Sequence, residues 1–252
     1  GELPVGCLGL DHRARRRNAE SAARVLILVL LFTILMSTAV TLCASAAPTG
    51  DEIAARVTEK LKEIRSVQGD IVASFSDPSS KSPINMTIRV SADRSTSITR
   101  MEITQHAVFE GQIVILDVKK DLTTVYMPVT GQAYRGKSAT IASQLGLDMG
   151  SFDLDSLLSM DPAGMMSFKY MRQDKYDRLP HHVVQTKPNT DVEGYQLVWV
   201  DCETYMVRKI EAFDGQGKLV ASITINNLKI NPKLDPVKLR ELPKGTRITD
   251  VK

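Results

Sequence analysis

The sequence predicts an α+β fold: a strongly curled antiparallel sheet, or half-barrel, of about eleven strands, with an N-terminal helix and a mid-chain helical lid on its concave face. Three observations predict it. Short runs of alternating apolar and polar residues occur in both halves of the chain, one amphipathic helix precedes them, and a segment with helical spacing separates the two halves.

The start of the chain resembles an export signal. Arg13 and Arg15–Arg17 precede the apolar run 25–36, and Ala44-Ser45-Ala46 has the small residues of a cleavage site. We therefore predict a signal peptide over 1–46 and a single domain over 47–252.

Two alternatives for this leader stay open. Counting on to Leu42 gives about 20 mostly apolar residues, which is enough for an uncleaved membrane anchor. Cys43 is a candidate for lipid modification, although the bulky Leu42 before it disfavours that. Each alternative places the rest of the chain outside the cytoplasm, either free in the periplasm or anchored and facing the periplasm or the cell exterior.

The composition of the remaining chain excludes a basic nucleic-acid-binding face. Beyond residue 46 there are 27 basic and 26 acidic residues, so the domain is close to neutral. Cys202 is the only cysteine there, so no internal disulfide can form. We expect the domain to depend on its apolar core and its sheet.

The first predicted helix begins after Thr49. Thr49 and Glu52 have the spacing of a capping box, in which each side chain bonds a free backbone amide at the helix start. Four apolar residues then fall on one stripe: Ile53, Val57, Leu61 and Ile64. This stripe must pack on an apolar surface.

Ten runs with strand character follow, separated by turn residues. Before the mid-chain segment they are 70–76, 84–90, 96–104, 112–118 and 122–127; after it they are 167–173, 181–186, 195–200, 205–213 and 218–230. Residues 214–217 form a hairpin turn. In the last run the apolar alternation slips by one residue, which predicts a bulge at Asn226-Asn227.

The segment 138–160 differs from these runs because it has few β-branched residues. It contains two helix-like pieces, 139–145 and 153–160, and Gly146 and Gly150 separate them. These pieces form the predicted lid. Methionines gather in and after it, and methionine adapts to irregular apolar shapes, although it also fills ordinary cores.

The end of the chain is divided by prolines. Asp235-Pro236 predicts the start of a short helix, because proline needs no amide partner in the first turn. Pro243 and Gly245 then redirect the chain, so that 246–251 can return as an edge strand.

The order of these parts resembles the outer-membrane lipoprotein carrier and sorting family (LolA/LolB-like) over nearly the whole chain beyond the leader. The matching pieces are "IRSVQGD" at 64–70, "ILDVKKDLTTVYMPVTGQAY" at 115–134, "NPKLD" at 231–235 and "LPKG" at 242–245. Each is short, and their order carries the resemblance. It implies a half-barrel whose apolar cavity holds acyl chains under a helical lid.

The candidate acyl-chain-binding residues come from the apolar strand faces and from the lid region. They are Phe75, Met86, Ile88, Met101, Ile113, Ile115, Leu145, Leu154, Leu157, Leu158, Met160, Met165 and Met166. The alternative is that these side chains fill an ordinary helix–sheet core.

The resemblance further implies an arginine that ties the lid to the barrel. Arg100 is its counterpart and Arg94 the alternative, within a stretch that lacks the family's proline and tryptophan. A solvated strand arginine is the other reading of both positions.

No residue pattern indicates catalysis, a metal or a cofactor. His106, His181 and His182 are the histidines beyond the leader, and neighbouring histidines on a strand point to opposite faces. No metalloprotease, nucleophile-elbow or phosphate-loop motif occurs. The protein is therefore not expected to be an enzyme.

The sequence thus favours a non-catalytic periplasmic carrier that shields acyl chains of lipoproteins or lipids and passes them toward the outer membrane. The resemblance implies an inner-membrane release complex and an outer-membrane acceptor as partners. Two alternatives stay open: an envelope-stress sensor or scaffold that binds a membrane-protein partner, and a tethered protein that passes lipid at a membrane surface.

Overall fold

The structure is a computed structural model that describes residues 47–76, 82–145, 166–189 and 193–251. The chain divides into two compact units, Gly1–Ala47 and Pro48–Lys252, and the description below concerns the second. The expected leader, 1–46, lies outside the described residues.

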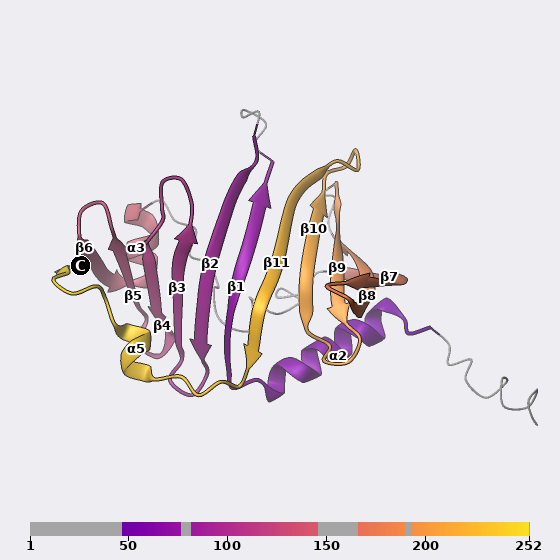
Figure 1. The fold of residues 1–252 in the computed structure, drawn as a ribbon, viewed down its shortest axis with the longest axis horizontal. Helices are drawn as coiled ribbons and strands as arrows, with labels where there is room; N and C mark the ends of the chain where they lie inside the picture. Colours follow the sequence, from indigo (N-terminus) through magenta and orange to yellow (C-terminus); the bar gives the residue numbers. More distant parts are fainter. Residues whose placement is uncertain (1–46, 77–81, 146–165, 190–192, 252) are drawn as a thin grey trace, which may run out of the picture. The chain divides into compact units, whose positions relative to one another are not determined.

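One open sheet of twelve strands forms this unit, in the order β12-β6-β5-β4-β3-β2-β1-β11-β10-β9-β8-β7 (Figure 1). The strands are β1 (Ser66–Phe75), β2 (Ile84–Asp93), β3 (Ile98–Gln105), β4 (Ile113–Asp117), β5 (Leu122–Met127), β6 (Gln132–Lys137), β7 (Met166–Tyr176), β8 (Leu179–Pro188), β9 (Tyr195–Asp201), β10 (Val207–Phe213), β11 (Leu219–Ile230) and β12 (Arg247–Asp250).

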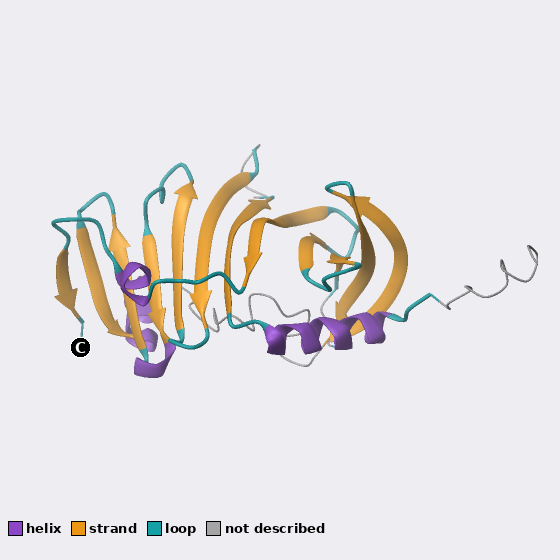
Figure 2. Ribbon diagram, turned by 60° about the horizontal axis from the view of Figure 1, so that its bottom comes forward, coloured by secondary structure: helices purple, strands orange, loops and turns teal. Residues whose placement is uncertain are grey.

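The predicted α+β fold with a curled antiparallel sheet is confirmed. Figure 2 shows that the sheet bends most at the end formed by β7–β9. Twelve strands are present where about eleven were expected. One pairing is parallel, since β12 joins the edge at β6 in the same direction.

Three α-helices lie within the described ranges: α2 (Gly50–Glu63), α3 (Ser138–Leu145) and α5 (Pro236–Arg240). A 3-10 turn, η1 (Val118–Lys120), joins β4 to β5. The predicted capping box starts α2, because Thr49 Oγ1 accepts from the Glu52 amide and Glu52 Oε2 accepts from the Thr49 amide.

The helices lie on opposite faces of the sheet. The Thr123 hydroxyl on β5 bonds the Ser138 hydroxyl at the start of α3, and the stripe of α2 packs on Val184 and Val198. Strand pairing places these three sheet residues on one face, which we call the α2–α3 face. The short helix α5 packs on the other face, which we call the α5 face.

The largest apolar core fills the space between α2 and the β7–β11 half of the sheet. Ile53 and Val57 of the predicted stripe are fully or almost fully buried there. The helix starts close to β7: a Cβ atom on Gly50 would lie 2.6 Å from the Phe168 carbonyl carbon. Glycine at this position therefore allows α2 to approach the sheet.

The predicted bulge in β11 is confirmed. Gln68 pairs with Lys229 and Asp70 with Asn226, so β11 has one residue more than β1 between these pairs. Asn227 adopts a φ of 52° in this bulge. Opposite it, Gly69 lies so close that a Cβ atom would be 3.2 Å from the Asn226 carbonyl oxygen.

The "NPKLD" segment ties the end of β11 to the start of β1. Asn231 Oδ1 accepts hydrogen bonds from the Arg65 and Ser66 amides, and the Ser66 hydroxyl donates to the Pro232 carbonyl oxygen. Asp235 then caps α5, its Oδ1 accepting from the Val237 amide at 2.9 Å. The expected helix start and the expected edge strand, β12, are both present.

Candidate functional site

An apolar surface lies on the α2–α3 face in the middle of the sheet. We call it the apolar floor, and its residues come from five adjacent strands: Ile223 (β11), Ile71 and Ala73 (β1), Met86, Ile88 and Val90 (β2), Met101 (β3), and Val114 and Leu116 (β4). Strand pairing aligns them, for example Ala73 with both Ile223 and Met86.

The floor lies between α2 and α3 on this face. The main sheet contacts of α2 are with β7 and β8, and those of α3 are with β6 and β5. Ile71, Ile88 and Val114 are half-buried, whereas Met101 and Leu116 on the same face are buried. The floor is therefore a wide apolar surface, and some of its side chains are accessible in part.

The floor reaches the strand ends where β1 leads into β2. Phe75, the last residue of β1, pairs with Ile84, the first of β2, and the two residues are 38% and 44% exposed. Two large apolar side chains are thus accessible beside the β1–β2 connection.

The opposite face of the same strands is polar. Its residues include Gln68, Asp70 and Ser74 on β1, Arg89 and Ser91 on β2, and Ser222 and Thr224 on β11. This part of the sheet therefore has one wet face and one apolar face, as expected for an antiparallel sheet with alternating residues.

Asp70 is held ionised on the polar face. The side-chain amide of Asn227 in the bulge donates to Asp70 Oδ2 at 2.9 Å, and Arg89 Nε donates to Asp70 Oδ1 at 3.1 Å. The hydrogen bond from Asn227 lowers the pKa of Asp70 below its usual value, and Arg89 adds to this effect against the opposing effect of burial.

The structure divides the predicted acyl-chain-binding residues between two faces. Phe75, Met86, Ile88 and Met101 lie on the α2–α3 face, three of them in the floor. Ile113 and Ile115 lie on the α5 face, where both are buried in a core with Leu239 of α5. They cannot join the floor, because a strand residue points to one face only.

Most of the predicted lid residues lie outside the described residues. This holds for Leu154, Leu157, Leu158, Met160 and Met165, and for the side chain of Leu145. Met166 starts β7, is half-buried and pairs with Pro188.

The two predicted latch arginines each bond a backbone carbonyl oxygen of a described segment. Arg100 Nη1 donates to the Glu241 carbonyl oxygen just after α5, on the α5 face. Arg94 Nη2 donates to the Leu61 carbonyl oxygen in the last turn of α2 at 3.2 Å. These hydrogen bonds connect Arg100 to the C-terminal segment and Arg94 to α2.

Several floor residues were not among the predicted site residues. Val114 and Leu116 were missed because "IVIL" at 113–116 is apolar at every position, so alternation does not separate its two faces. Ile71, Ala73 and Val90 could have been included, because each continues the alternation of a predicted residue on its own strand.

A second ionisable group lies under α2. Burial lowers the pKa of His182, and the nearby Arg56 and His181 lower it further. The ring of His182 lies 6.0 Å from that of Tyr205, whose hydroxyl accepts a hydrogen bond from Arg56 on α2. These contacts stabilise the docking of α2.

Within the described ranges, no group of three or more histidine, cysteine, aspartate or glutamate residues is placed to hold a metal ion. The same residues include no helix long and apolar enough to cross a membrane.

The sequence matches no family model and no curated protein. The structure is similar to that of an uncharacterized conserved protein from Thermus thermophilus, with 12% identity, 80% of this chain and 98% of that chain covered, and a TM-score of 0.54.

Two further solved structures are similar with TM-scores below 0.5. One is the MucA/MucB complex of Pseudomonas aeruginosa, with 15% identity, 75% and 60% of the two chains covered and a TM-score of 0.48. The other is a LolA superfamily protein from Nitrosomonas europaea, with 16% identity, 76% and 97% covered and a TM-score of 0.34. At these identities the likeness concerns the fold alone.

Proposed function

We propose that the protein is an exported, non-catalytic carrier that shields acyl chains of lipoproteins or lipids on the apolar floor. The observation that carries the proposal is the contrast between the faces of β11, β1 and β2, which are apolar on one side and polar on the other. An apolar sheet face must be covered by other apolar groups.

The energetics favour an acyl chain as the ligand of such a surface. Burial of each methylene is worth about 0.8 kcal/mol, so a chain of about 16 carbons exposed to water costs about 12 kcal/mol. A carrier offsets most of this cost, yet it must release its cargo. Two floor residues are methionines, Met86 and Met101, and their flexible side chains can adapt to different chains.

The half-burial of Ile71, Ile88 and Val114 supports this reading over that of a closed core. Residues of the core under α2, such as Ile53 and Val198, are almost fully buried. The middle of the same face retains accessible apolar area. We propose that the cargo extends along this area toward Phe75 and Ile84 at the strand ends of β1 and β2.

The leader and the predicted lid complete the proposal. Residues 1–46 direct export to the periplasm, or anchor the domain there, and residues 47–252 form the binding domain. The apolar residues of 145–165 cover the cargo, including Leu154, Leu157 and Leu158. An inner-membrane release complex and an outer-membrane acceptor are the partners that such a carrier needs.

Native mass spectrometry of the protein purified from cells tests the carrier. We expect a copurified acylated species in the wild type and its loss, by about tenfold or more, in Ile88→Asp, because a charge on the floor opposes hydrocarbon. Thr87→Asp is the matched control. It adds the same charge to the same strand on the polar face and should retain the cargo.

Two results would contradict the proposal. A wild-type protein that is always empty would favour a scaffold that binds a membrane-protein partner. Equal loss of cargo in Ile88→Asp and Thr87→Asp, with both variants folded by circular dichroism, would show that binding does not use the floor.

A further inference from the structure

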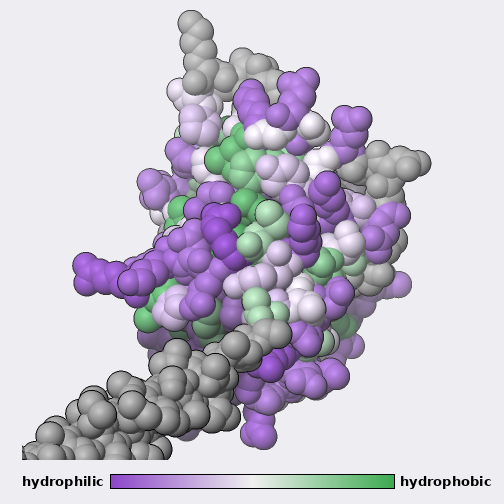
Figure 3. Space-filling model, turned by 90° about the vertical axis from the view of Figure 1, so that its right-hand side faces the viewer, coloured by the Kyte–Doolittle hydropathy of each residue, from purple (hydrophilic) through white to green (hydrophobic). Residues whose placement is uncertain are grey.

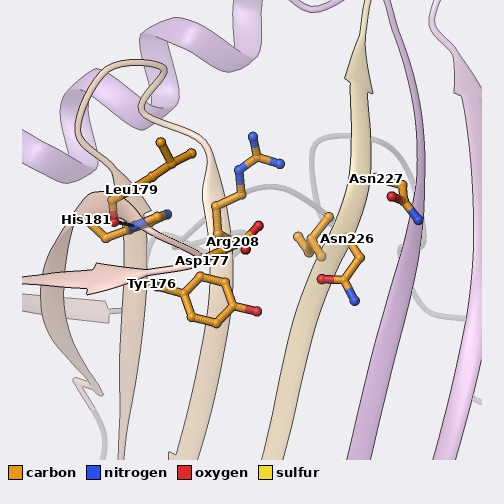
Figure 4. A pocket seen from close by; sticks show the side chains of 8 residues that line it. Tyr176, Asp177, Leu179, His181, Arg208, Asn226 and Asn227 are labelled. Atoms are coloured by element: carbon orange, nitrogen blue, oxygen red, sulfur yellow. Dashed lines mark hydrogen bonds between the residues drawn. The ribbon is translucent and has the colours of Figure 1, made fainter.

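A polar cavity of about 350 Å³ lies at the end of the sheet that contains β7, β8, β10 and β11 (Figure 4). Its lining comes from the β7–β8 hairpin, β10 and β11: Tyr176, Asp177, Leu179, His181, Arg208, Ile225, Asn226 and Asn227. This volume is within the range of small-molecule sites.

The cavity is separate from the apolar floor. Val183, two residues after His181 on β8, pairs with Trp199, and Trp199 pairs with Lys209, which pairs with Thr224 on the polar face of β11. His181 therefore points to the face opposite the floor. Figure 3 shows this end of the molecule as a mainly hydrophilic surface with smaller hydrophobic areas.

Two irregularities in neighbouring strands form one side of the cavity. The pairing of β10 with β9 shifts between Val207 and Lys209, so Arg208 occupies a bulge. Asn226 and Asn227 occupy the bulge of β11 beside it. Bulges redirect side chains, and these two place a guanidinium and two amides around one cavity.

Arg208 and Asp177 carry opposite charges without an ion pair between them. Among the described residues, the Arg208 guanidinium has no hydrogen-bond or salt-bridge partner, and neither does the Asp177 carboxylate. Both line the same cavity. Within the described part of the chain, the cavity wall therefore contains one guanidinium and one carboxylate without a polar partner.

His181 adds a buried acceptor. Its side chain is 1% exposed, and its Nδ1 lies 2.9 Å from the Leu179 carbonyl oxygen, so Nδ1 carries the proton and donates it. Nε2 is then an acceptor, and it is buried without a hydrogen-bond partner among the described residues. In Figure 4 the imidazole turns this free edge toward the side where Arg208 and Tyr176 lie. Such an unpaired buried group favours a ligand with a donor.

We propose that this cavity binds a small zwitterion that carries an anionic group and a primary ammonium group. Arg208 takes the anionic group, because its planar fork matches carboxylate or phosphate oxygens. Asp177 takes the ammonium group, and His181 Nε2 accepts one of its hydrogens. Asn226 and the Tyr176 hydroxyl can bond the remaining ligand oxygens.

The opposite charges of Arg208 and Asp177 disfavour a ligand that carries a charge of only one sign. A plain anion would satisfy Arg208 but would meet the Asp177 carboxylate. A plain cation would meet the guanidinium. Because His181 and Asn226 face away from the floor and no floor residue lines the cavity, its occupation does not depend on the proposed acyl-chain carrier.

The same zwitterion can come from two sources: a free small molecule, or the phosphoethanolamine head group of a lipid surface. Isothermal titration of the purified protein with O-phosphoethanolamine tests the first source. Flotation with vesicles of phosphatidylethanolamine and phosphatidylcholine, against vesicles of phosphatidylcholine alone, tests the second.

Two variants test the assigned contacts. Arg208→Gln should lower the affinity for O-phosphoethanolamine about tenfold or more, since hydrogen bonds to a charged partner are lost. Arg178→Gln removes the same charge from the β7–β8 turn, at a residue that does not line the cavity, and should leave the affinity unchanged. Asp177→Asn should erase the preference of the wild type for O-phosphoethanolamine over glycerol 3-phosphate, and asparagine keeps the left-handed turn at φ 50°.

The results show whether the cavity binds the zwitterion and from which source it comes. Binding of the soluble probe alone assigns a free ligand, and additional binding to the phosphatidylethanolamine vesicles assigns a head group. Binding of neither probe overturns the proposal. Equal losses in Arg208→Gln and Arg178→Gln, or an unchanged preference in Asp177→Asn, would also overturn it.

Discussion

The side-chain amide of Asn227 donates to the Asp70 carboxylate at 2.9 Å, joining the bulge of β11 to the neighbouring strand β1. This contact explains two features of the sequence together. Gly69 gives the bulge the room it needs, and Asp70 next to it supplies the acceptor. The segments "QGD" at 68–70 and "NN" at 226–227 are therefore structurally complementary on the neighbouring strands β1 and β11.

Asp70→Ala should lower the free energy of unfolding by about 1–2 kcal/mol at pH 7, because it removes two hydrogen bonds to a charged group. The effect should shrink at low pH. The pKa of Asp70 is lower in the folded state, so its contribution is complete above the unfolded-state pKa of about 3.9 and is lost as the pH falls through the folded-state pKa.

Urea denaturation at pH 7 and at pH 3, followed by circular dichroism, measures both values. Asp214→Ala serves as a control, since its carboxylate bonds only amides of its own hairpin. A loss for Asp70→Ala that is as large at pH 3 as at pH 7 would mean that the carboxylate charge is not the source.

The sequence was sufficient for the elements that have a local signal. The capping box at Thr49 and Glu52 and the bulge at Asn226-Asn227 both follow from neighbouring residues, and both are present. The start of α5 at Asp235-Pro236 follows in the same way from the fixed backbone of proline.

The face of a uniformly apolar strand has no local signal. Ile113 and Ile115 share β4 with Val114 and Leu116, and only the pairing with β3 and β5 decides which pair faces α5. Arg100 bonds the backbone carbonyl oxygen of Glu241, which is distant in sequence. A pattern of side chains cannot predict a backbone partner, so this contact also had no local signal. Polar residues from distant parts of the sequence, such as those of the cavity on β7, β8, β10 and β11, also meet only in the folded chain.

Gly50→Ala should lower the midpoint of thermal unfolding, although alanine is the better helix former by about 1 kcal/mol. Its Cβ would lie 2.6 Å from the Phe168 carbonyl carbon, so α2 must move away from β7. We expect a net loss of about 1–3 kcal/mol, as for overpacked cores. Glu59→Ala, at an exposed position of the same helix, controls for the effect of alanine on helix propensity. If both changes stabilise the protein, α2 does not approach β7 as closely as the structure indicates.

Arg100→Met should loosen the C-terminal segment and leave cargo binding unchanged. The guanidinium bonds the Glu241 carbonyl oxygen on the α5 face, away from the floor. Limited proteolysis should therefore cut the variant faster between 231 and 246, with an unfolding free energy lower by about 1 kcal/mol. Arg135→Met, which loses a salt bridge to Asp250 on β12, is the matched control. Loss of cargo in Arg100→Met with unchanged proteolysis would support the role of a lid latch instead.

Leu157→Asp and Met165→Asp test the predicted lid, whose residues lie outside the described ranges. If these side chains cover cargo on the floor, each change should reduce copurified acyl species about tenfold or more, because a charge opposes burial of hydrocarbon. If the two side chains cover cargo and fill no core, the sheet should stay folded. Circular dichroism measures the fold and native mass spectrometry measures the copurified acyl species on the same sample.

Ser159→Asp, which puts the same charge on a polar position of the same predicted helix, should retain both fold and cargo. If Leu157→Asp or Met165→Asp unfolds the domain outright, the side chain belongs to a structural core and its assignment to a lid is wrong.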